Sequence, residues 1–316
     1  MIKEKNMKNI RQEFKEKGIF YTSSELAETL KKYVPFKPKK VYDPTCGAGN
    51  LLAVFDDDIE KYGQELYEDQ LNIAAERLKN FHGYAGDTLI DDGFKDEKFD
   101  CIVGNPPFSI KWEQNPNDER FNKAGVLPPP SKADYAFLLH ILHHLSDDGI
   151  AVVLNFPGIL YRGNKEGKVR EWFVRNNYIE KVIAIPKDKF VDTNISTCIL
   201  VLRKNKETTD IFFEATETVA THAATMVEIA KNNFNLSVHT YAYIEEEKEK
   251  IDIQTLNAEL RECDVKHIIA NLEYDYQICK LEGDMLAHRN FVKTVKRAVE
   301  EYEKRLEEEE NNNEMS

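Results

Sequence analysis

The stretch Phe99-Asp100-Cys101-Ile102-Val103, followed by Gly104-Asn105-Pro106-Pro107-Phe108, decides how the rest of the chain is interpreted. The short apolar run predicts a buried strand. Neither proline has an N–H for a strand ladder, so the chain must leave the sheet as a stiff loop at the strand's carboxyl end. Asn105 is thereby presented as a side-chain amide beside a backbone carbonyl, with an aromatic ring close behind. This set suits an exocyclic amino group and a planar base. Taken alone, it is equally well a proline-bracketed turn.

Size and composition indicate an ordinary globular protein. The 316 residues can bury an ample core in one large domain or two small ones. No run approaches the ~18 apolar residues of a membrane span, and the N-terminus lacks the apolar core of a signal peptide. The five cysteines are scattered, odd in number and without a C-x-x-C pair. This pattern argues against a disulfide framework or a zinc site and favours a reducing cytoplasm.

The net charge of −13 is unfavourable for a nucleic-acid-binding protein. The charge is unevenly spread, however. Residues from Ile244 to the end hold 20 acidic and 11 basic side chains, a balance of −9, which leaves −4 for the rest of the chain. Most of the acidity therefore belongs to the C-terminal part, and a locally basic cleft elsewhere is not excluded.

A glycine-bearing loop, Asp43-Pro44-Thr45-Cys46-Gly47-Ala48-Gly49-Asn50, follows a strand predicted over residues 39–43. The residues that predict the start of a helix after this loop are Leu51, Leu52, Val54 and Phe55. Strand, loop and helix in this order are typical of a nucleotide-binding loop, where glycines let a ligand approach the backbone. The third glycine of a dinucleotide fingerprint and the Gly-Lys-Ser/Thr of a P-loop are missing, so Gly-x-Gly alone is weak evidence.

Polar side chains follow four successive predicted strands. Asp43 ends the first strand, Glu65 the second and Asp87 the third, while Asn105 follows the fourth. Glu65 lies 16 residues past Gly49, close to where α/β nucleotide folds place a ribose-binding acid. Because the carboxyl ends of parallel strands meet at one edge of a sheet, we expect a ligand site there. The order of elements predicts a doubly wound, mostly parallel α/β sheet.

Thr22 and Glu25, three residues apart, fit a capping box at the start of a helix. The apolar residues at helical spacing are Leu26, Ala27, Leu30 and Tyr33. The pattern predicts at least a well-capped helix. Its terminal hydroxyl and N–H groups also suit the carboxylate of a ligand.

A long loop is predicted over residues 109–131. It contains Trp112, Phe121, Lys111, Arg120, Lys123 and the run Pro128-Pro129-Pro130. A loop of this length in a compact domain is usually functional or disordered. Its aromatic and basic content predicts a lid over a substrate.

A strongly apolar helix is predicted from Ala133. The histidines on it are His140, His143 and His144. Their spacing invites a metal site, but Asp147 and Asp148 stand before Gly149 and favour a turn into the next strand. We therefore expect no metal.

Further strands are predicted over residues 149–154, 179–185, 196–202 and 211–213, and the second and third of these are expected to close the sheet. Between the first two, residues 158–175 carry a charge balance of +3. A solvated helix face and a surface for phosphates both explain this balance. A short helix is predicted near residues 226–230.

A heptad pattern runs through the C-terminal part. Its members are Leu281, Met285, His288, Val292, Val295, Val299, Tyr302 and Leu306. A terminal helix that packs on its own domain explains the pattern. A helix that pairs with a partner explains it better, because the region has no obvious core role.

In combination, these motifs resemble those of the N6-adenine DNA methyltransferases, in their usual order. Phe20-Tyr21-Thr22, with Ser23 in place of the family's usual proline, is similar to the motif that contacts the methionine part of S-adenosylmethionine (SAM). Asp43-Pro44-Thr45-Cys46-Gly47-Ala48-Gly49 is similar to the SAM loop. The resemblance implies that Glu65 binds the cofactor ribose, that Asp87 lies near its adenine, and that Asn105-Pro106-Pro107-Phe108 is catalytic.

More narrowly, the chain resembles the methyltransferase (M) subunit of type I restriction-modification systems from about Phe20 to Tyr243. The stretches that carry this resemblance are Ser131-Lys132-Ala133-Asp134-Tyr135-Ala136-Phe137, residues 158–163, residues 194–200 and Asn235-Leu236-Ser237. Those subunits usually have a sizeable N-terminal helical domain, and here almost nothing precedes the first motif.

The resemblance implies methyl transfer from SAM to the N6 of a flipped-out adenine in DNA. It implies that Asn105 and the carbonyl of Pro106 accept the N6 hydrogens, and that Phe108 stacks on the base. Two sources of target recognition are expected as alternatives: a separate specificity subunit that docks on the C-terminal helix, or a short recognition segment in the loop over residues 109–131. Two alternatives stay open: a glutamine-N5 protein methyltransferase, since Asn-Pro-Pro can hold a side-chain amide equally well, and a catalytically idle SAM-binding partner of a specificity protein.

The expected organisation has three parts. Residues 1–18 form a lead-in, residues 19–243 a SAM-dependent methyltransferase domain, and residues 244–316 an acidic helical extension that is a candidate coiled coil.

Overall fold

A mixed β-sheet, nine-stranded in the described residues, is the centre of the first of two compact units, Met1–Ile244. The second unit is Glu245–Ser316. The computed structural model describes residues 22–186, 196–243 and 252–314, with side chains as far as residue 305. The lead-in expected over residues 1–18 lies outside the described residues.

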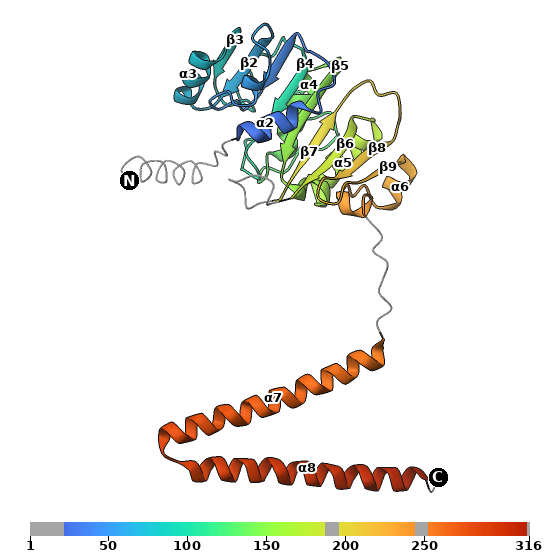
Figure 1. The fold of residues 1–316 in the computed structure, drawn as a ribbon. Coiled ribbons are helices and arrows are strands. Elements are labelled where there is room, and N and C mark those ends of the chain that lie inside the picture. Colours follow the sequence, from blue (N-terminus) through green and yellow to red (C-terminus); the bar gives the residue numbers. More distant parts are fainter. Residues whose placement is uncertain (1–21, 187–195, 244–251, 315–316) are drawn as a thin grey trace. The chain divides into compact units, whose positions relative to one another are not determined.

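The strands lie in the order β3-β2-β1-β4-β5-β7-β6-β8-β9 (Figure 1). Their bounds are β1 Lys40–Asp43, β2 Glu60–Glu65, β3 Phe81–Ala85, β4 Phe99–Gly104, β5 Leu145–Asn155, β6 Ile179–Ile185, β7 Thr197–Leu202, β8 Ile211–Ala215 and β9 Ala220–Ala224. Strands β3 to β5 in this order are parallel, whereas β7 runs antiparallel to both β5 and β6. Strand β8 is parallel to β6, and β9 is antiparallel to β8. The predicted doubly wound, mostly parallel sheet is confirmed.

Successive side chains of the central strands enter two separate cores, because neighbours along a strand point to opposite faces. In β5, Ile150, Val152 and Leu154 belong to one core, and Ala151 and Val153 to the other. Helices α2 and α3 contribute to the first core, and α4, α5 and α6 to the second. Their bounds are α2 Ser24–Lys31, α3 Glu68–Arg77, α4 Asp134–His144, α5 Asn164–Arg175 and α6 Met226–Lys231. The sheet is therefore a middle layer between two layers of helices.

The prediction of a helix after the glycine-bearing loop is wrong. Only a single 3-10 turn, η1 Leu52–Val54, is present, and the backbone is extended at Phe55. The apolar residues nevertheless pack inward, since Leu51, Leu52 and Phe55 are buried. Three consecutive aspartates at residues 56–58 follow, and aspartate favours turns over helix interiors. Residues 86–98 between β3 and β4 also contain no helix, so of the first three crossovers only the one from β2 to β3 is helical.

The sheet also extends further than expected. Strands β6 and β7 do not close it, because β8 and β9 lie beyond β6. The residues of β9 include no large apolar side chain, which explains why no strand was predicted there. Asp147 and Asp148 lie within β5 and not in a turn, since α4 passes directly into β5 at the buried Leu145.

Two further short 3-10 turns occur among the described residues of the first unit. They are η2 Pro157–Leu160 and η4 Val238–Thr240.

The second unit consists of two long helices, α7 Ile253–Glu282 and α8 Met285–Glu314. Helix α7 ends at Gly283, whose φ is +76°, and Asp284 Oδ1 accepts the N–H of Ala287 as α8 begins. The prediction of one heptad helix from Leu281 is therefore wrong, because Leu281 lies in α7. Beside the turn, Asp275 Oδ2 and His288 Nδ1 are 2.6 Å apart and join the two helices. Among the described helices, none has the length and apolar character needed to cross a membrane.

Candidate functional site

The ends of four neighbouring strands build the site. Asp43 ends β1, Glu65 ends β2, Asp87 follows β3 and Asn105 follows β4. The chain reverses direction along the sheet between β1 and β4, and such a switch point is where open α/β sheets bind ligands. The structure thus brings together the four strand-end polar groups that the sequence singled out. They line one cavity.

Most of the predicted site residues line this cavity. Those that do are Thr22, Asp43, Thr45, Cys46, Gly47, Ala48, Glu65, Asp87, Asn105 and Pro107. Those that do not are Ser23, Gly49, Pro106 and Phe108. Tyr21 lies outside the described residues. We refer to this cavity as the acidic pocket.

Hydrogen bonds fix the glycine-bearing loop to the end of β2. The N–H of Gly47 donates to Glu65 Oε2 at 2.8 Å, and the N–H of Thr45 donates to Asp43 Oδ1 at 3.0 Å. Gly49 has a φ of +78°, and a Cβ there would stand 2.7 Å from Leu78 Cδ1. The second glycine is therefore required both by its backbone conformation and by the approach of α3.

The acidic pocket is suited to a cationic ligand. The pKa of Asp43 is raised to about 7, chiefly by burial and to a smaller extent by the nearby Glu65, while the hydrogen bonds from Thr45 oppose the shift. Burial also raises the pKa of Glu65, although backbone N–H groups of Tyr67 and Gly47 oppose the shift. With Asp87 the lining holds three carboxyl groups, and its described residues include no lysine, arginine or histidine. Both raised pKa values fall back if a positive charge binds nearby.

This donor set fits SAM, the cofactor that the sequence resemblance implies. SAM carries a positively charged sulfonium and an ammonium group, and the three carboxyl groups match this charge. A pyrophosphate cofactor is disfavoured by the same three groups. Glu65 stands at the end of β2, where α/β folds bind a ribose. The residues present therefore fit SAM better than a dinucleotide.

Asn105 is held so that its side-chain oxygen has no partner. Its Nδ2 donates to Thr22 Oγ1 at 3.1 Å. Its Oδ1 is buried and makes no hydrogen bond. The amide is thus oriented by one end and presents an acceptor with the other, as a site for an amino group requires.

Thr22 does not cap the helix, contrary to the capping box predicted with Glu25. The N-cap is Ser23, whose Oγ accepts the N–H of Leu26 at 3.2 Å. Ser23 is one residue nearer the helix, and it also satisfies the geometry of an N-cap. The Thr22 hydroxyl is therefore free to hold Asn105. Ser23 contributes to the site by placing Thr22 and not by lining the pocket.

Asp134 and Arg162 fix the chain just after Phe108, a role that the sequence did not predict for either residue. Ser109, with a φ of +54°, donates its N–H to Asp134 Oδ1 at 3.1 Å. Arg162 NH2 donates to Ser109 Oγ at 3.2 Å. Phe108 itself is half-buried against the core that contains α2. The sequence signal for Asp134 was its place in the stretch Ser131–Phe137, which is part of the sequence resemblance.

A second, basic cavity lies beside this point. Its lining residues are Pro129, Ser131, Lys132, Arg162, Gly163, Asn164, Lys165 and Glu166. Two other cations of the +3 segment are engaged in the fold instead. Arg170 is buried and donates to the carbonyls of Phe234, Ile159 and Arg162, and Arg175 pairs with Glu171. Arg162 and Lys165 line the cavity, and Arg162 NH1 also lies 3.4 Å from Glu166 Oε1 and 3.9 Å from Asp134 Oδ2.

The loop over residues 109–131 is not the free lid that its composition predicted. Trp112 and Phe121 are buried in the core, and Trp112 Nε1 donates to the Pro129 carbonyl at 3.0 Å. Arg120 is also buried. The aromatic residues of this loop therefore anchor it to the fold and are not presented to a ligand.

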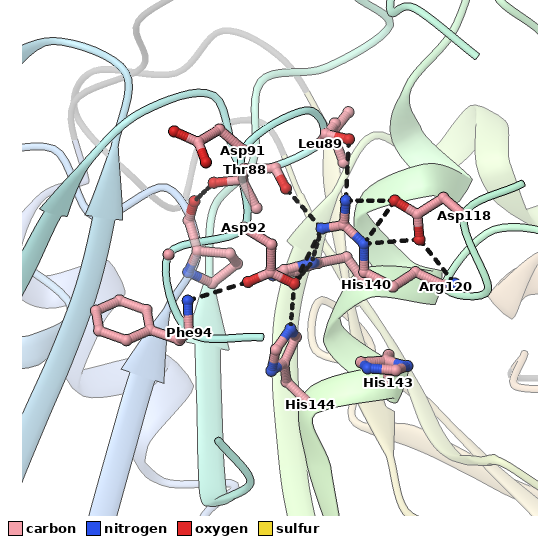
Figure 2. A network of polar contacts seen from close by, with 12 residues as sticks. Thr88, Leu89, Asp91, Asp92, Phe94, Asp118, Arg120, His140, His143 and His144 are labelled. Carbon is pink, nitrogen blue, oxygen red and sulfur yellow. Dashed lines mark hydrogen bonds and ion pairs between the residues drawn. The ribbon is translucent and has the colours of Figure 1, made fainter. Parts of the chain in front are cut away.

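A buried polar cluster surrounds Arg120 (Figure 2). Asp92, His140 and His144 place ligand-type atoms within 4.8 Å of one another, an arrangement that a metal ion can use. Arg120 NH1, however, lies 3.2 Å from Asp92 Oδ2 and 3.0 Å from His140 Nδ1. A guanidinium cation thus already stands among these groups and makes them a poor metal site.

Comparison with known proteins gives one consistent family. Residues 4–223 match the family described as N-6 DNA Methylase. The type I restriction enzyme MpnII methylase subunit of Mycoplasma pneumoniae is 30% identical over 330 residues, which cover 82% of this chain and 61% of that protein. The type I restriction enzyme MjaIX methylase subunit of Methanocaldococcus jannaschii is 30% identical over 210 residues, which cover 60% of this chain and 38% of that protein.

Solved structures agree. The methyltransferase subunit of a type I restriction-modification system from Streptococcus thermophilus is 29% identical, with a TM-score of 0.66, and the match covers 71% of this chain and 59% of that one. The chain spans about three fifths or less of the length of these three proteins.

Binding of SAM is expected to weaken as the pH falls through the pKa of Asp43. The free pocket holds this pKa at about 7. A cationic ligand binds the ionised carboxylate better, so a protonated Asp43 must lose its proton first. We expect the dissociation constant to rise about tenfold between about pH 8 and about pH 6, measured by calorimetry.

The Asp43→Asn variant provides the control, because it retains a similar shape without the titration. It should bind SAM more weakly but with a much flatter pH profile, after the ligand's own titration is subtracted from both proteins. Identical profiles in the two proteins contradict the assignment.

Proposed function

The chain belongs to the N-6 DNA methylase family, and from this premise we propose that it transfers the methyl group of SAM to the N6 amino group of an adenine in DNA. We further propose that it acts as the modification subunit of a type I-like system. The observation that carries the proposal is the buried, unpartnered Asn105 Oδ1 at the end of β4, beside the acidic pocket.

Asn105 supplies the acceptor that the reaction requires. The N6 nitrogen of adenine is a poor nucleophile, because its lone pair is delocalised into the ring. Acceptance of its hydrogens by Asn105 Oδ1 and the Pro106 carbonyl favours a pyramidal nitrogen and directs the lone pair outward. Because Thr22 already orients the amide, little reorganisation is needed during the reaction. Positioning of the two reactants supplies much of the remaining rate increase.

The acidic pocket is the proposed cofactor site. When bound there, SAM supplies an activated methyl group on its sulfonium. Glu65 would accept hydrogen bonds from the ribose hydroxyls, Asp87 would contact the adenine, and Asp43 and Thr22 would hold the methionine part. The backbone of Gly47 and Ala48 lines the pocket and allows the cofactor to approach closely.

The adenine must leave the duplex to reach this site, at a cost of a few kcal/mol. The basic cavity supports DNA as the acceptor, since phosphate contacts are made chiefly by arginine, lysine and backbone N–H groups. Lys132, Arg162 and Lys165 outnumber Glu166 in its lining, and Arg162 contacts Ser109, which follows the catalytic motif directly. Phe108 is the proposed stacking partner of the extruded base.

The two-helix unit is the proposed docking site for a separate specificity subunit. Its helices expose many large apolar side chains. They include Leu256, Leu260, Ile268, Ile269, Leu286, Phe291, Val292, Val299 and Tyr302. A pair of helices with such faces gains stability by burying them against a partner's helices.

Asn105→Ala is expected to lower adenine methylation by more than about 100-fold, because it removes the acceptor for the amino group. SAM binding should change little, since the remaining lining of the acidic pocket is intact. Transfer of labelled methyl groups to DNA measures the first quantity and calorimetry the second. The matched control is Asn205→Ala, because Asn205 is exposed and bonds to Asp148 at the opposite edge of the sheet.

Wild-type methylation by the Asn105→Ala variant would falsify the catalytic assignment. The same assay with protein acceptors in place of DNA tests the glutamine-N5 alternative. Wild-type protein that binds SAM but labels neither acceptor, even with a specificity subunit present, supports the idle-partner alternative.

The double variant Lys132→Ala and Lys165→Ala is expected to weaken DNA binding at all sequences alike. The slope of log affinity against log salt should fall in magnitude by about two, because two phosphate contacts are lost. Fluorescence anisotropy at several salt concentrations measures this slope. The control is the pair Lys37→Ala and Lys79→Ala, which changes the charge equally but alters only exposed ion pairs with Asp56, Asp57 and Asp58. Equal slopes in the two double variants contradict a role for the basic cavity.

The triple variant Val292→Ser, Val299→Ser and Tyr302→Ser is expected to abolish co-purification with a co-expressed specificity subunit. These three side chains are exposed on α8 and lose most of their apolar surface in the variant. SAM binding should be unchanged, because the acidic pocket belongs to the other compact unit. The control is the triple variant Lys293→Ser, Glu300→Ser and Glu303→Ser. These three residues are polar and exposed on the same helix. Undiminished co-purification of the apolar variant rules out α8 as the docking helix.

A further inference from the structure

Arg120 is a buried arginine in which all five N–H groups find acceptors. Nε and NH2 donate to Asp118, with the shortest contact, NH2 to Oδ2, at 2.6 Å. NH2 also donates to the carbonyl of Leu89 at 3.1 Å. NH1 donates to the carbonyl of Thr88 at 2.8 Å and contacts Asp92 and His140. Nothing in the proposed reaction uses this residue directly.

The contacts of Arg120 lead to the wall of the acidic pocket. Thr88, whose carbonyl Arg120 holds, lines the pocket next to Asp87. The hydroxyl of Thr88 donates to the carbonyl of Pro44, which also lines the pocket. Arg120 therefore fixes residues 87–89, and through Thr88 it also supports the glycine-bearing loop.

The other side of Arg120 is equally well fixed (Figure 2). Asp92 Oδ2 accepts from His144 Nε2 at 2.9 Å as well as from Arg120. His144 Nδ1 faces the carbonyl of Glu97 at 3.0 Å, so each ring nitrogen of this buried histidine has a polar partner. Burial alone would raise the pKa of Asp92, but the His144 bond, His140 and Arg120 hold it well below its usual range. The Arg120 guanidinium thus pairs with both Asp92 and Asp118 in the interior.

We propose that Arg120 is a positioning residue for the cofactor: it holds the Asp87-Thr88-Leu89 segment in the conformation that SAM requires. The proposal rests on the proposed function, in that the acidic pocket is taken to bind SAM. Arg120 does not line the pocket and acts through the backbone carbonyls of Thr88 and Leu89. Because it belongs to the loop that begins after the catalytic motif, it also connects that loop to the cofactor wall.

Only arginine can make this set of contacts. Lysine has three donors on one atom, so it cannot reach Asp118 and the two carbonyls together. Arg120→Lys should therefore leave the Thr88 segment free to move while retaining a positive charge. We expect the full-length variant to bind SAM about tenfold more weakly by calorimetry, the loss that corresponds to one buried hydrogen bond.

Loss of stability alone must be distinguished from loss of positioning. Arg170→Lys is the matched control, because Arg170 is as deeply buried as Arg120 and, like it, donates to backbone carbonyls. Its three carbonyl partners belong to residues that do not line the acidic pocket. Both variants should lower the midpoint of thermal unfolding, but only Arg120→Lys should weaken SAM binding. If Arg120→Lys does not fold, Asp118→Asn replaces it, since Asp118 anchors the far edge of the guanidinium, and it should weaken SAM binding in the same direction by a smaller factor.

Two results separate the proposals. If the wild-type protein does not bind SAM, the proposed function fails. If the wild-type protein binds SAM and the Arg120 or Asp118 variant binds it equally tightly, or if Arg170→Lys weakens binding to the same extent, Arg120 has no positioning role.

Discussion

A buried acceptor without a partner, Asn105 Oδ1, is the feature on which the rest of the site depends. Leaving such an atom unpaired costs about 1 to 3 kcal/mol. The fold sustains this cost because Asn105 cannot turn away. Its Nδ2 is held by Thr22, and Pro106 and Pro107 stiffen the chain directly after it. This cost is local, and the central strands β4 and β5, most of whose residues are buried, supply the stability that sustains it.

Charge is distributed so that the two proposed ligands meet opposite potentials. The acidic pocket gathers three carboxyl groups, which attract a sulfonium and raise the pKa values of Asp43 and Glu65. The basic cavity is joined to the end of the catalytic motif by the contact of Arg162 with Ser109, and its lining has a surplus of cations. The overall charge of −13 therefore says little about the site, because each cavity is governed by the charges within a few ångströms of it.

Strand ends could be predicted from the sequence far better than side-chain partners. Asp43, Glu65, Asp87 and Asn105 were found because alternation of strands and loops places them at one edge of the sheet, whatever the details between. The N-cap was predicted at Thr22 and lies at Ser23, because two adjacent hydroxyl residues both fit an N-cap and the local pattern does not choose between them. Arg120 and Asp134 were missed in their roles since their partners lie 20 to 32 residues away in the sequence, at Thr88, Leu89, His140 and Ser109. The roles given to the site residues themselves remain predictions.

The loop after the catalytic motif connects the two halves of the site mechanically. At Ser109 it is tied to Asp134 and Arg162 on the side of the basic cavity, and at Arg120 it is tied to Thr88 on the side of the acidic pocket. Its interior is anchored by Trp112 and Phe121 in the core. If a ligand in either cavity favours one arrangement of this loop, the other cavity must respond by the same free energy, because coupling between sites is reciprocal. A loop that is packed into the core and bonded at both ends is better suited to such coupling than the free lid that its composition predicted.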